Sequence, residues 1–174
     1  VDPETYPSAV SDPSATSPSY TVDVPSGVTG ATTIEGLSIS GGSLSTNYGI
    51  RCDGSPVITD CPSISGGGGT ASCGIAIAGS GSPAVSNCTV NGGSGTGESM
   101  GMYVCGNSPV IDSCTIKGGS SNGTTFGVFV GCNAQLTNNT IESGAGNNSE
   151  AIGVYVDGGQ PHIQNNTIND VQIM

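Results

Sequence analysis

The chain has 174 residues, of which two are basic and 13 are acidic, so its formal net charge at pH 7 is -11. A surface this acidic is a poor partner for nucleic acid or an anionic membrane, and the sequence offers no run of 18 apolar residues to span a bilayer. Apolar residues make up 34%, too few for one broad core but enough for a narrow core repeated along an axis. We therefore expect no nucleic-acid partner and no membrane insertion.

The first 19 residues are rich in Pro and Ser and poor in apolar residues. Such a composition favours an extended arm or a linker over a packed element. Regularly placed Ile and Val begin at about residue 20. We therefore divide the chain into an arm or linker over residues 1–19 and a folded domain over residues 20–174.

A short phrase repeats along this domain: a glycine, an apolar residue, a variable residue, then an apolar residue or cysteine. Its glycines recur every 25 to 27 residues, at Gly49, Gly74, Gly101, Gly127 and Gly153. A fixed period in this range is typical of a solenoid, in which each repeat buries its apolar stripe against the next. An incomplete copy over residues 34–39 adds one more repeat, so we expect about six coils.

Each repeat contains three short stretches with strand character. The first follows the glycine, as in Ile75-Ala76-Ile77, and alternation places its outer two residues inside and its middle residue outside. Apolar residues such as Val85 and Val90 mark the second and third stretches. Turns of Gly, Asn and Pro separate stretches that are too short for helices. With coils stacked about 4.8 Å apart, equivalent side chains would form rows along the axis.

The last repeat reads GVYV at residues 153–156 and PHIQNNTI at residues 161–168. This pattern and its upstream copies resemble the right-handed parallel β-helix repeats of the pectate-lyase-like superfamily, in its non-catalytic branch of bacterial surface proteins. The resemblance covers roughly residues 20–174 and implies an all-β, right-handed parallel β-helix of about six coils with three short strands per coil. It implies little about function, because the superfamily includes lyases, hydrolases, adhesins and inert stalks.

A row of small polar or sulfur side chains follows the second strand of the repeats, at Cys61, Cys88, Cys114, Asn139 and Asn166. In folds of this kind a stacked asparagine lines the tight turn, and its amides bond from coil to coil. We therefore interpret the row as a structural ladder in which cysteine, which tolerates burial, replaces asparagine. The alternative is a metal or redox site. Because a linear stack cannot surround an ion tetrahedrally, we expect no metal site and no cofactor.

Seven cysteines are present, an odd number, so at least one thiol stays free or pairs outside the chain. Cys105 and Cys132 lie near equivalent turns of neighbouring coils, at a separation that a disulfide could span. They are the pair for which we expect a bridge.

Tyr103, Phe129 and Tyr155 are expected to form an outward row on consecutive coils and are the candidate ligand-binding residues. Exposed aromatic rings on a flat sheet can bind sugar rings, but they can also pack against each other and shield backbone hydrogen bonds. Both interpretations stay open from the sequence. A second row is expected to belong to the core: Tyr48, Cys73, Met100, Phe126 and Ile152.

A row of hydroxyl side chains raises ice binding as a minor alternative: Ser38, Ser63, Thr89, Thr115, Thr140 and Thr167. Its outward neighbours, which include Lys117 and Glu142, vary in size and charge. Such an uneven strip is a poor match to a lattice, and Thr also favours strands for its own β-branched reasons.

Catalysis in such a fold needs clustered acids, or a calcium site with a basic proton acceptor. Asp53 and Asp157 occupy similar turns but lie four coils apart, and His162 has no nucleophile beside it. We therefore expect no catalytic residues, although the sequence does not decide whether the protein is an enzyme.

These patterns predict an extracellular or cell-surface module with a structural or adhesive, non-catalytic role and a glycan or protein partner. Carbohydrate binding or processing is one alternative. The other is a filament of subunits stacked head to tail, because the chain stops just after a strand at residues 171–174 and either belongs to a longer protein or leaves an open end.

Overall fold

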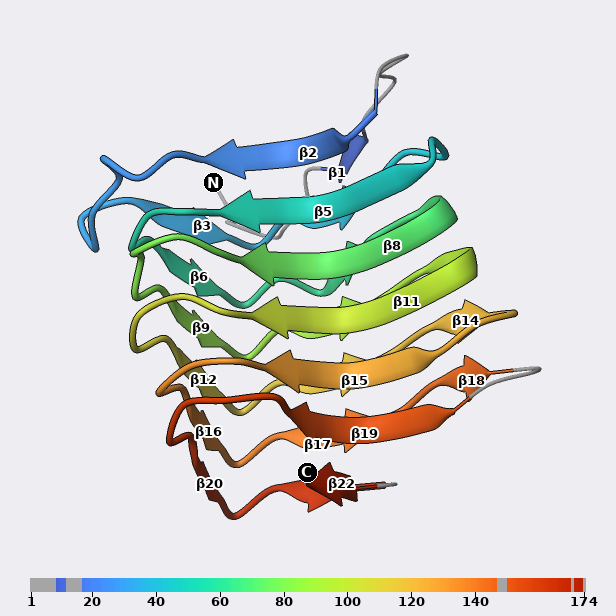
Figure 1. The fold of residues 1–174 in the computed structure, drawn as a ribbon. Helices are drawn as coiled ribbons and strands as arrows, with labels where there is room; N and C mark the ends of the chain where they lie inside the picture. The colour runs from blue at the N-terminus through green and yellow to red at the C-terminus, as the bar shows by residue number, and fades with distance from the viewer. Residues whose placement is uncertain (1–8, 12–16, 147–149, 170, 174) are drawn as a thin grey trace.

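The computed structural model describes residues 9–11, 17–146, 150–169 and 171–173. In this part of the chain every regular element is a strand, and consecutive strands wind into a stack of coils (Figure 1). Each complete coil gives one strand to each of three parallel sheets. The fold is therefore an all-β solenoid of about six turns with three strands per coil, as the repeat predicts. The described residues include no helix with the length and hydropathy of a membrane span.

The long strands lie in sheet 1: β2 (Ser19–Val24), β5 (Thr46–Cys52), β8 (Gly68–Ile77), β11 (Ser94–Val104), β15 (Thr125–Val130), β19 (Ala151–Val156) and β22 (Val171–Ile173), with β14 (Ser120–Ser121) and β18 (Ala145–Gly146) alongside. Sheet 2 contains β3 (Thr33–Glu35), β6 (Val57–Thr59), β9 (Ala84–Ser86), β12 (Val110–Asp112), β16 (Gln135–Thr137) and β20 (His162–Gln164). Sheet 3 contains β1 (Ala9–Ser11), β4 (Ser38–Ser40), β7 (Ser63–Ser65), β10 (Thr89–Asn91), β13 (Thr115–Lys117), β17 (Thr140–Glu142) and β21 (Thr167–Ile168).

The coils stack in register. In sheet 1, for example, Val104 pairs with Ile77 on one side and with Val130 on the other. Where one repeat is a residue longer, the extra residue is absorbed by a bulge between Gly95 and Glu98 in β11. Equivalent residues of successive repeats therefore lie over one another, which is the arrangement that every row assignment requires.

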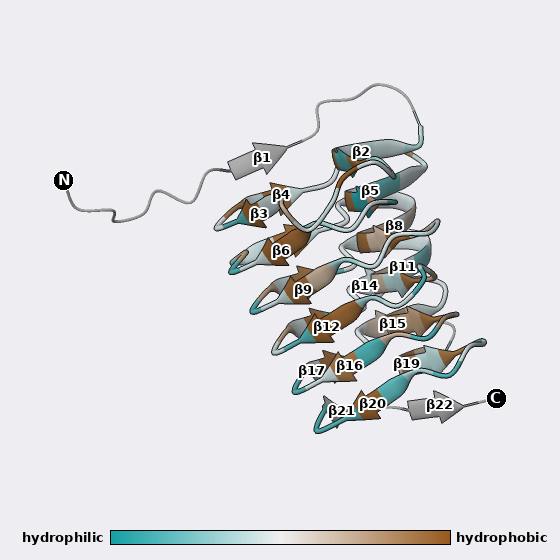
Figure 2. Ribbon diagram, turned by 90° about the vertical axis from the view of Figure 1, so that its left-hand side faces the viewer, coloured by the Kyte–Doolittle hydropathy of each residue, from teal (hydrophilic) through white to brown (hydrophobic). Residues whose placement is uncertain are grey.

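The core is a narrow column between the three sheets, visible in Figure 2 as apolar segments repeated from coil to coil. Sheet 2 contributes a row of side chains with at most 1% exposure: Ile58, Val85, Ile111 and Leu136. The row continues to Ile163 in β20, the last described strand of this sheet, where exposure rises to 36%. A side chain in this column is fully buried only where a neighbouring coil covers it on each side.

The repeated glycines are required by close packing between coils. A Cβ atom at Gly101 would lie 2.6 Å from the carbonyl oxygen of Gly127 and 2.6 Å from Cγ2 of Ile116. Any side chain would therefore collide with the neighbouring coil and with the third strand of its own coil. This contact explains why the glycine is the most regular feature of the sequence.

Candidate ligand-binding face

Three aromatic side chains expected to form an outward row do lie together on sheet 1. Tyr103 pairs in register with Phe129, and Phe129 with Tyr155. The Tyr103 and Phe129 ring centroids are 5.3 Å apart with 19° between their planes, and the Phe129 and Tyr155 centroids are also 5.3 Å apart. All three side chains are half-buried. The rings thus pack against each other and still present a partly exposed aromatic surface.

The prediction that the second row belongs to the core is wrong for its larger members. Tyr48, Met100 and Phe126 are only half-buried and lie on the outer face of sheet 1. Phe126 packs edge-on against Phe129, with centroids 5.9 Å apart and planes at 88°, and its centroid lies 5.7 Å from that of Tyr155. The aromatic surface therefore has two adjacent rows.

The cause is a break in strand alternation at the repeated glycine. Gly49 and Ile50 are both buried, and a Cβ at Gly49 would lie 3.0 Å from Cγ2 of Ile64 in the interior. Two successive residues therefore face inward, and Tyr48 faces outward where uninterrupted alternation predicts the reverse. The only signal in the sequence was the presence of aromatic rings in a core otherwise built from Ile and Val.

The coil of β8 interrupts both outward rows. Ala76 lies between Arg51 and Tyr103, and Cys73 lies between Tyr48 and Met100. A pocket of about 240 Å³ opens over these small residues. Its floor is apolar, and larger side chains from β5 and β11 form its two walls. Alternation places Ala76 outward, as expected from the sequence, but the spacing alone does not show that larger residues on both sides enclose it.

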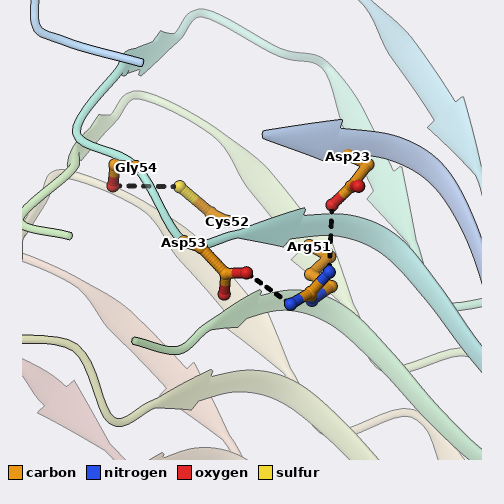
Figure 3. A network of polar contacts seen from close by, with 5 residues as sticks. All are labelled: Asp23, Arg51, Cys52, Asp53 and Gly54. Atoms are coloured by element: carbon orange, nitrogen blue, oxygen red, sulfur yellow. Dashed lines mark hydrogen bonds and ion pairs between the residues drawn. The ribbon is translucent and has the colours of Figure 1, made fainter. Parts of the chain in front are cut away.

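Arg51 is held at the edge of this pocket by two carboxylates (Figure 3). Its Nη1 lies 3.5 Å from Oδ1 of Asp23, and its Nη2 forms an ion pair with Oδ2 of Asp53. The guanidinium carbon also lies 5.2 Å from the ring centroid of Tyr20, within the range of a cation–π contact. The positive charge of Arg51 is thus already engaged inside the protein.

Both tyrosines of the pocket walls stay neutral over a wide pH range. A hydrogen bond with the Cys105 side chain, together with burial, raises the pKa of Tyr103 to about 12. Burial raises the pKa of Tyr48. The walls therefore present uncharged rings and hydroxyl groups at physiological pH.

The expected ladder residues Cys61, Cys88, Cys114, Asn139 and Asn166 form one row at the turn between sheets 2 and 3. The Asn139 Nδ2 group donates to the Ile111 carbonyl at 3.0 Å, and the Cys114 thiol contacts the equivalent Val85 carbonyl at 3.8 Å. Sulfur thus occupies the place of the amide donor, with a longer and weaker hydrogen bond.

The residue before each ladder position has a left-handed backbone, with φ between 53° and 58° at Asp60, Asn87, Ser113, Asn138 and Asn165. Asn and Asp tolerate this conformation better than most residues. The contacts and turn geometry account for the row as a structural feature.

The expected Cys105–Cys132 disulfide is absent, and all seven cysteines are free thiols. Cys105 follows Val104, so register places it over Gly131 and one position away from Cys132. Successive residues of an extended chain point in opposite directions. The Cys132 thiol instead donates inward to the Val104 carbonyl at 3.4 Å, whereas Cys105 is half-buried.

Three of the buried thiols, those of Cys61, Cys73 and Cys88, are poorly suited to react. Hydrogen bonding with Cys114, followed by burial, raises the pKa of Cys88 to about 11, and burial raises the pKa of Cys73 to about 12. A hydrogen bond with Cys88 is the main cause that raises the pKa of Cys61. Since the thiolate is the nucleophile and the metal ligand, these cysteines lack the ionised form that such chemistry needs near neutral pH.

Several acidic side chains of the described residues make local contacts. The Asp112 carboxylate accepts hydrogen bonds from the hydroxyl groups of Thr137 and Ser113 and from the Asn138 amide, which lower its pKa. Nε2 of His162 lies 3.0 Å from Oε1 of Gln164. Within the described ranges, His, Cys, Asp and Glu do not gather in groups of three suited to a metal ion.

The hydroxyl row lies on sheet 3, away from the aromatic rows. Beside it, the Lys117 Nζ and Glu142 Oε2 atoms form an ion pair at 3.1 Å across neighbouring strands. Charged side chains therefore interrupt the surface next to the hydroxyl groups, as expected for a strand-stabilising row.

A family model described as the right handed beta helix region matches residues 20–170. The chain belongs to the right-handed β-helix family. Comparison with curated proteins and with solved structures gave no match. Membership in the β-helix family agrees with the parallel sheets and the stacked coils, and the β-helix supplies a rigid frame for the aromatic face. The function of the chain has to be inferred from the residues of that face, because a fold of this kind hosts many functions.

Proposed function

We propose that this β-helix is a non-catalytic module that binds carbohydrate through the outer face of sheet 1, in an adhesive role at the cell surface or outside the cell. The observation that carries the proposal is the partly exposed aromatic surface formed by Tyr103, Phe126, Phe129 and Tyr155 on three consecutive coils. Aromatic rings expose apolar faces with polar edges nearby, and a pyranose ring offers the complementary C–H face and hydroxyl rim.

The rigidity of the solenoid supports this proposal. The aromatic rings sit on paired strands whose core residues are buried, so little conformational entropy would be lost on binding. The dispersed acids support a binding role over hydrolysis, because paired carboxylates at a defined separation are what glycoside cleavage uses. Of the glycan and protein partners considered from the sequence, we propose the glycan.

The test is binding of the purified chain to a glycan array, followed by titration calorimetry with the glycans that bind. Tyr155→Ala removes one ring at the end of the aromatic row, and Thr140→Ala changes an exposed hydroxyl on sheet 3 as a matched control. We expect Tyr155→Ala to weaken binding about tenfold, which is roughly 1.4 kcal/mol, and Thr140→Ala to leave it unchanged. Absence of glycan binding by the wild type, or equal affinity of Tyr155→Ala, would contradict the proposal.

Head-to-tail self-assembly is a second candidate, favoured by the edges of the stack. Among the described strands, β20 lies at one end of sheet 2 with Ile163 at 36% exposure, and β3 lies at the other end with Ile34 half-buried. Both isoleucines belong to the same inward row, so β20 of one copy stacked on β3 of another would continue sheet 2 in register. Concentration-dependent growth in light scattering that Ile163→Asp abolishes would support it, and a monomer at all concentrations would exclude it.

A further inference from the structure

The pocket over the β8 coil has the form of a missing ring in the outward rows. On one side of it Tyr20 and Tyr48 stack with centroids 5.4 Å apart, and on the other side Tyr103 and Phe129 stack at 5.3 Å. In each row the β8 coil has Cys73 or Ala76 in place of a bulky side chain. Across the gap Tyr48 lies opposite Met100, and Tyr103 lies opposite Arg51. The strands β5 and β11 that carry these walls stand two strand spacings apart, roughly 10 Å, which leaves room for one flat ring and not for two.

The size of the pocket agrees with a single ring. Its volume of about 240 Å³ lies below the range of about 300–1,000 Å³ that is usual for sites of drug-sized ligands. The floor at Ala76 is only 5% exposed, so the larger side chains of the walls already cover most of it. The occupant is one ring of a larger molecule whose remainder can lie on the neighbouring aromatic surface.

Polar groups around the pocket favour a sugar over an aromatic side chain of a partner protein. Thr46 and Glu98 lie at one end of the pocket, and Tyr48 and Tyr103 belong to its walls. Their oxygens can exchange hydrogen bonds with a ring that carries hydroxyl groups around its edge. A phenyl ring has no such groups and would leave these oxygens to water.

The charge around the pocket favours a neutral sugar. Arg51 could attract a carboxylate, but its guanidinium group is already paired with Asp23 and Asp53. Glu98 lies on the opposite wall, and the whole chain has a net charge of -11. An acidic polysaccharide would meet a field that repels it and an arginine without a free charge to offer.

We propose that this pocket binds one ring of a neutral glycan and discriminates against acidic glycans; the proposal rests on carbohydrate binding by sheet 1. The test uses Ala76→Tyr, which restores a ring to the row and fills the pocket from its floor. Ala84→Tyr makes the same change on the same coil at an exposed position of sheet 2 and serves as the control. The probes are cellohexaose, xylohexaose and mannohexaose, with hexagalacturonate as the acidic counterpart, all measured by titration calorimetry.

We expect at least one neutral hexasaccharide to bind at least tenfold more tightly than hexagalacturonate, and Ala76→Tyr to lower that affinity at least tenfold while Ala84→Tyr leaves it unchanged. If Ala76→Tyr does not fold, Tyr48→Ala, which removes a wall, is expected to weaken binding to a similar extent. Tighter binding of hexagalacturonate overturns the charge argument. If Tyr155→Ala weakens binding but Ala76→Tyr leaves it unchanged, the proposal that the pocket binds a sugar ring is overturned and the proposed function stands. Failure of all four sugars to bind overturns the pocket proposal, whereas the proposed function is overturned only if the glycan array shows no binding either. Binding of a tryptophan-containing peptide at the pocket, with no binding of any sugar, also overturns the pocket proposal.

Discussion

Asn139 and Asn166 are joined by their side chains along the solenoid axis. Nδ2 of Asn139 donates to Oδ1 of Asn166 at 2.9 Å, and the same Oδ1 accepts from the Asn139 backbone N–H at 2.8 Å. Oδ1 of Asn139 in turn accepts from the Cys114 backbone N–H at 2.8 Å. Each ladder asparagine thus satisfies backbone groups of the preceding coil.

Removal of one ladder amide should therefore destabilise the protein more than removal of a surface amide. Asn139→Ala leaves the Cys114 N–H and the Ile111 carbonyl without these partners, and each unsatisfied buried group costs about 1–3 kcal/mol. We expect a loss of about 2–4 kcal/mol in the free energy of unfolding, measured by urea denaturation. Asn139→Cys, which copies the upstream coils, should recover part of that loss. A loss below 1 kcal/mol for Asn139→Ala would show that the ladder contributes little.

The repeat period and the stacking rows could be predicted from the sequence, because a solenoid places equivalent residues over one another. Val85, Ile111 and Leu136 are buried in one row for this reason. The outward position of Tyr48 could not be predicted, because a single glycine shifts the alternation by one residue. The pocket was also beyond sequence reasoning, since it depends on the side chains that surround Ala76 from two other coils.

Cysteine pairing failed as a prediction for a related reason. Sequence spacing places Cys105 and Cys132 close together, but a disulfide also depends on direction, and a shift of one position turns the two thiols apart. The turns between strands, expected to contain Gly, Asn and Pro, were easier to place, because the left-handed conformation of Asn138 and Asn165 is a local preference of asparagine.

The thiol arrangement predicts selective labelling of the native protein. Cys105 is half-buried, whereas the other six cysteines are buried. A thiol reagent such as DTNB should therefore modify one thiol per chain rapidly under native conditions and all seven in denaturant, and Cys105→Ser should abolish the rapid phase. Rapid modification that persists in Cys105→Ser would contradict this assignment, and fewer than seven thiols in denaturant would indicate a disulfide.

The inward glycine row predicts strong intolerance of even one methyl group. Gly101→Ala would place a Cβ 2.6 Å from the Gly127 carbonyl oxygen, so neighbouring coils would have to separate. We expect a loss of about 2 kcal/mol or more in the free energy of unfolding, seen as a lowered Tm. Gly27→Ala is the control, because a Cβ there meets no atom within 4 Å and should change stability by less than about 0.5 kcal/mol. Equal effects of the two substitutions would contradict the packing argument.

The buried cysteines predict alkaline instability. The folded-state pKa values of Cys52 and Cys88 are about 11 and that of Cys73 is about 12, raised by burial at Cys52 and Cys73 and chiefly by the hydrogen bond with Cys114 at Cys88. Unfolded thiols ionise near pH 9, so between about pH 9 and pH 11 the unfolded chain loses protons that the folded protein keeps. Stability is therefore fully present below pH 9 and falls as pH rises toward 11 to 12.

Each thiol with a raised pKa contributes a slope of up to about 1.4 kcal/mol per pH unit in this range, and Cys61 and Cys132, whose pKa values are also raised, add to the three above. The free energy of unfolding should therefore fall by about 4 kcal/mol per pH unit or more. Urea denaturation at pH 8, 9, 10 and 11 measures the slope. Cys73→Ala removes one ionising group and should reduce the slope by about 1.4 kcal/mol per pH unit, even though the cavity lowers stability at every pH. A slope unchanged by Cys73→Ala would show that the pKa of this thiol is the same in the folded and unfolded states. Burial of the sulfur would then not raise its pKa.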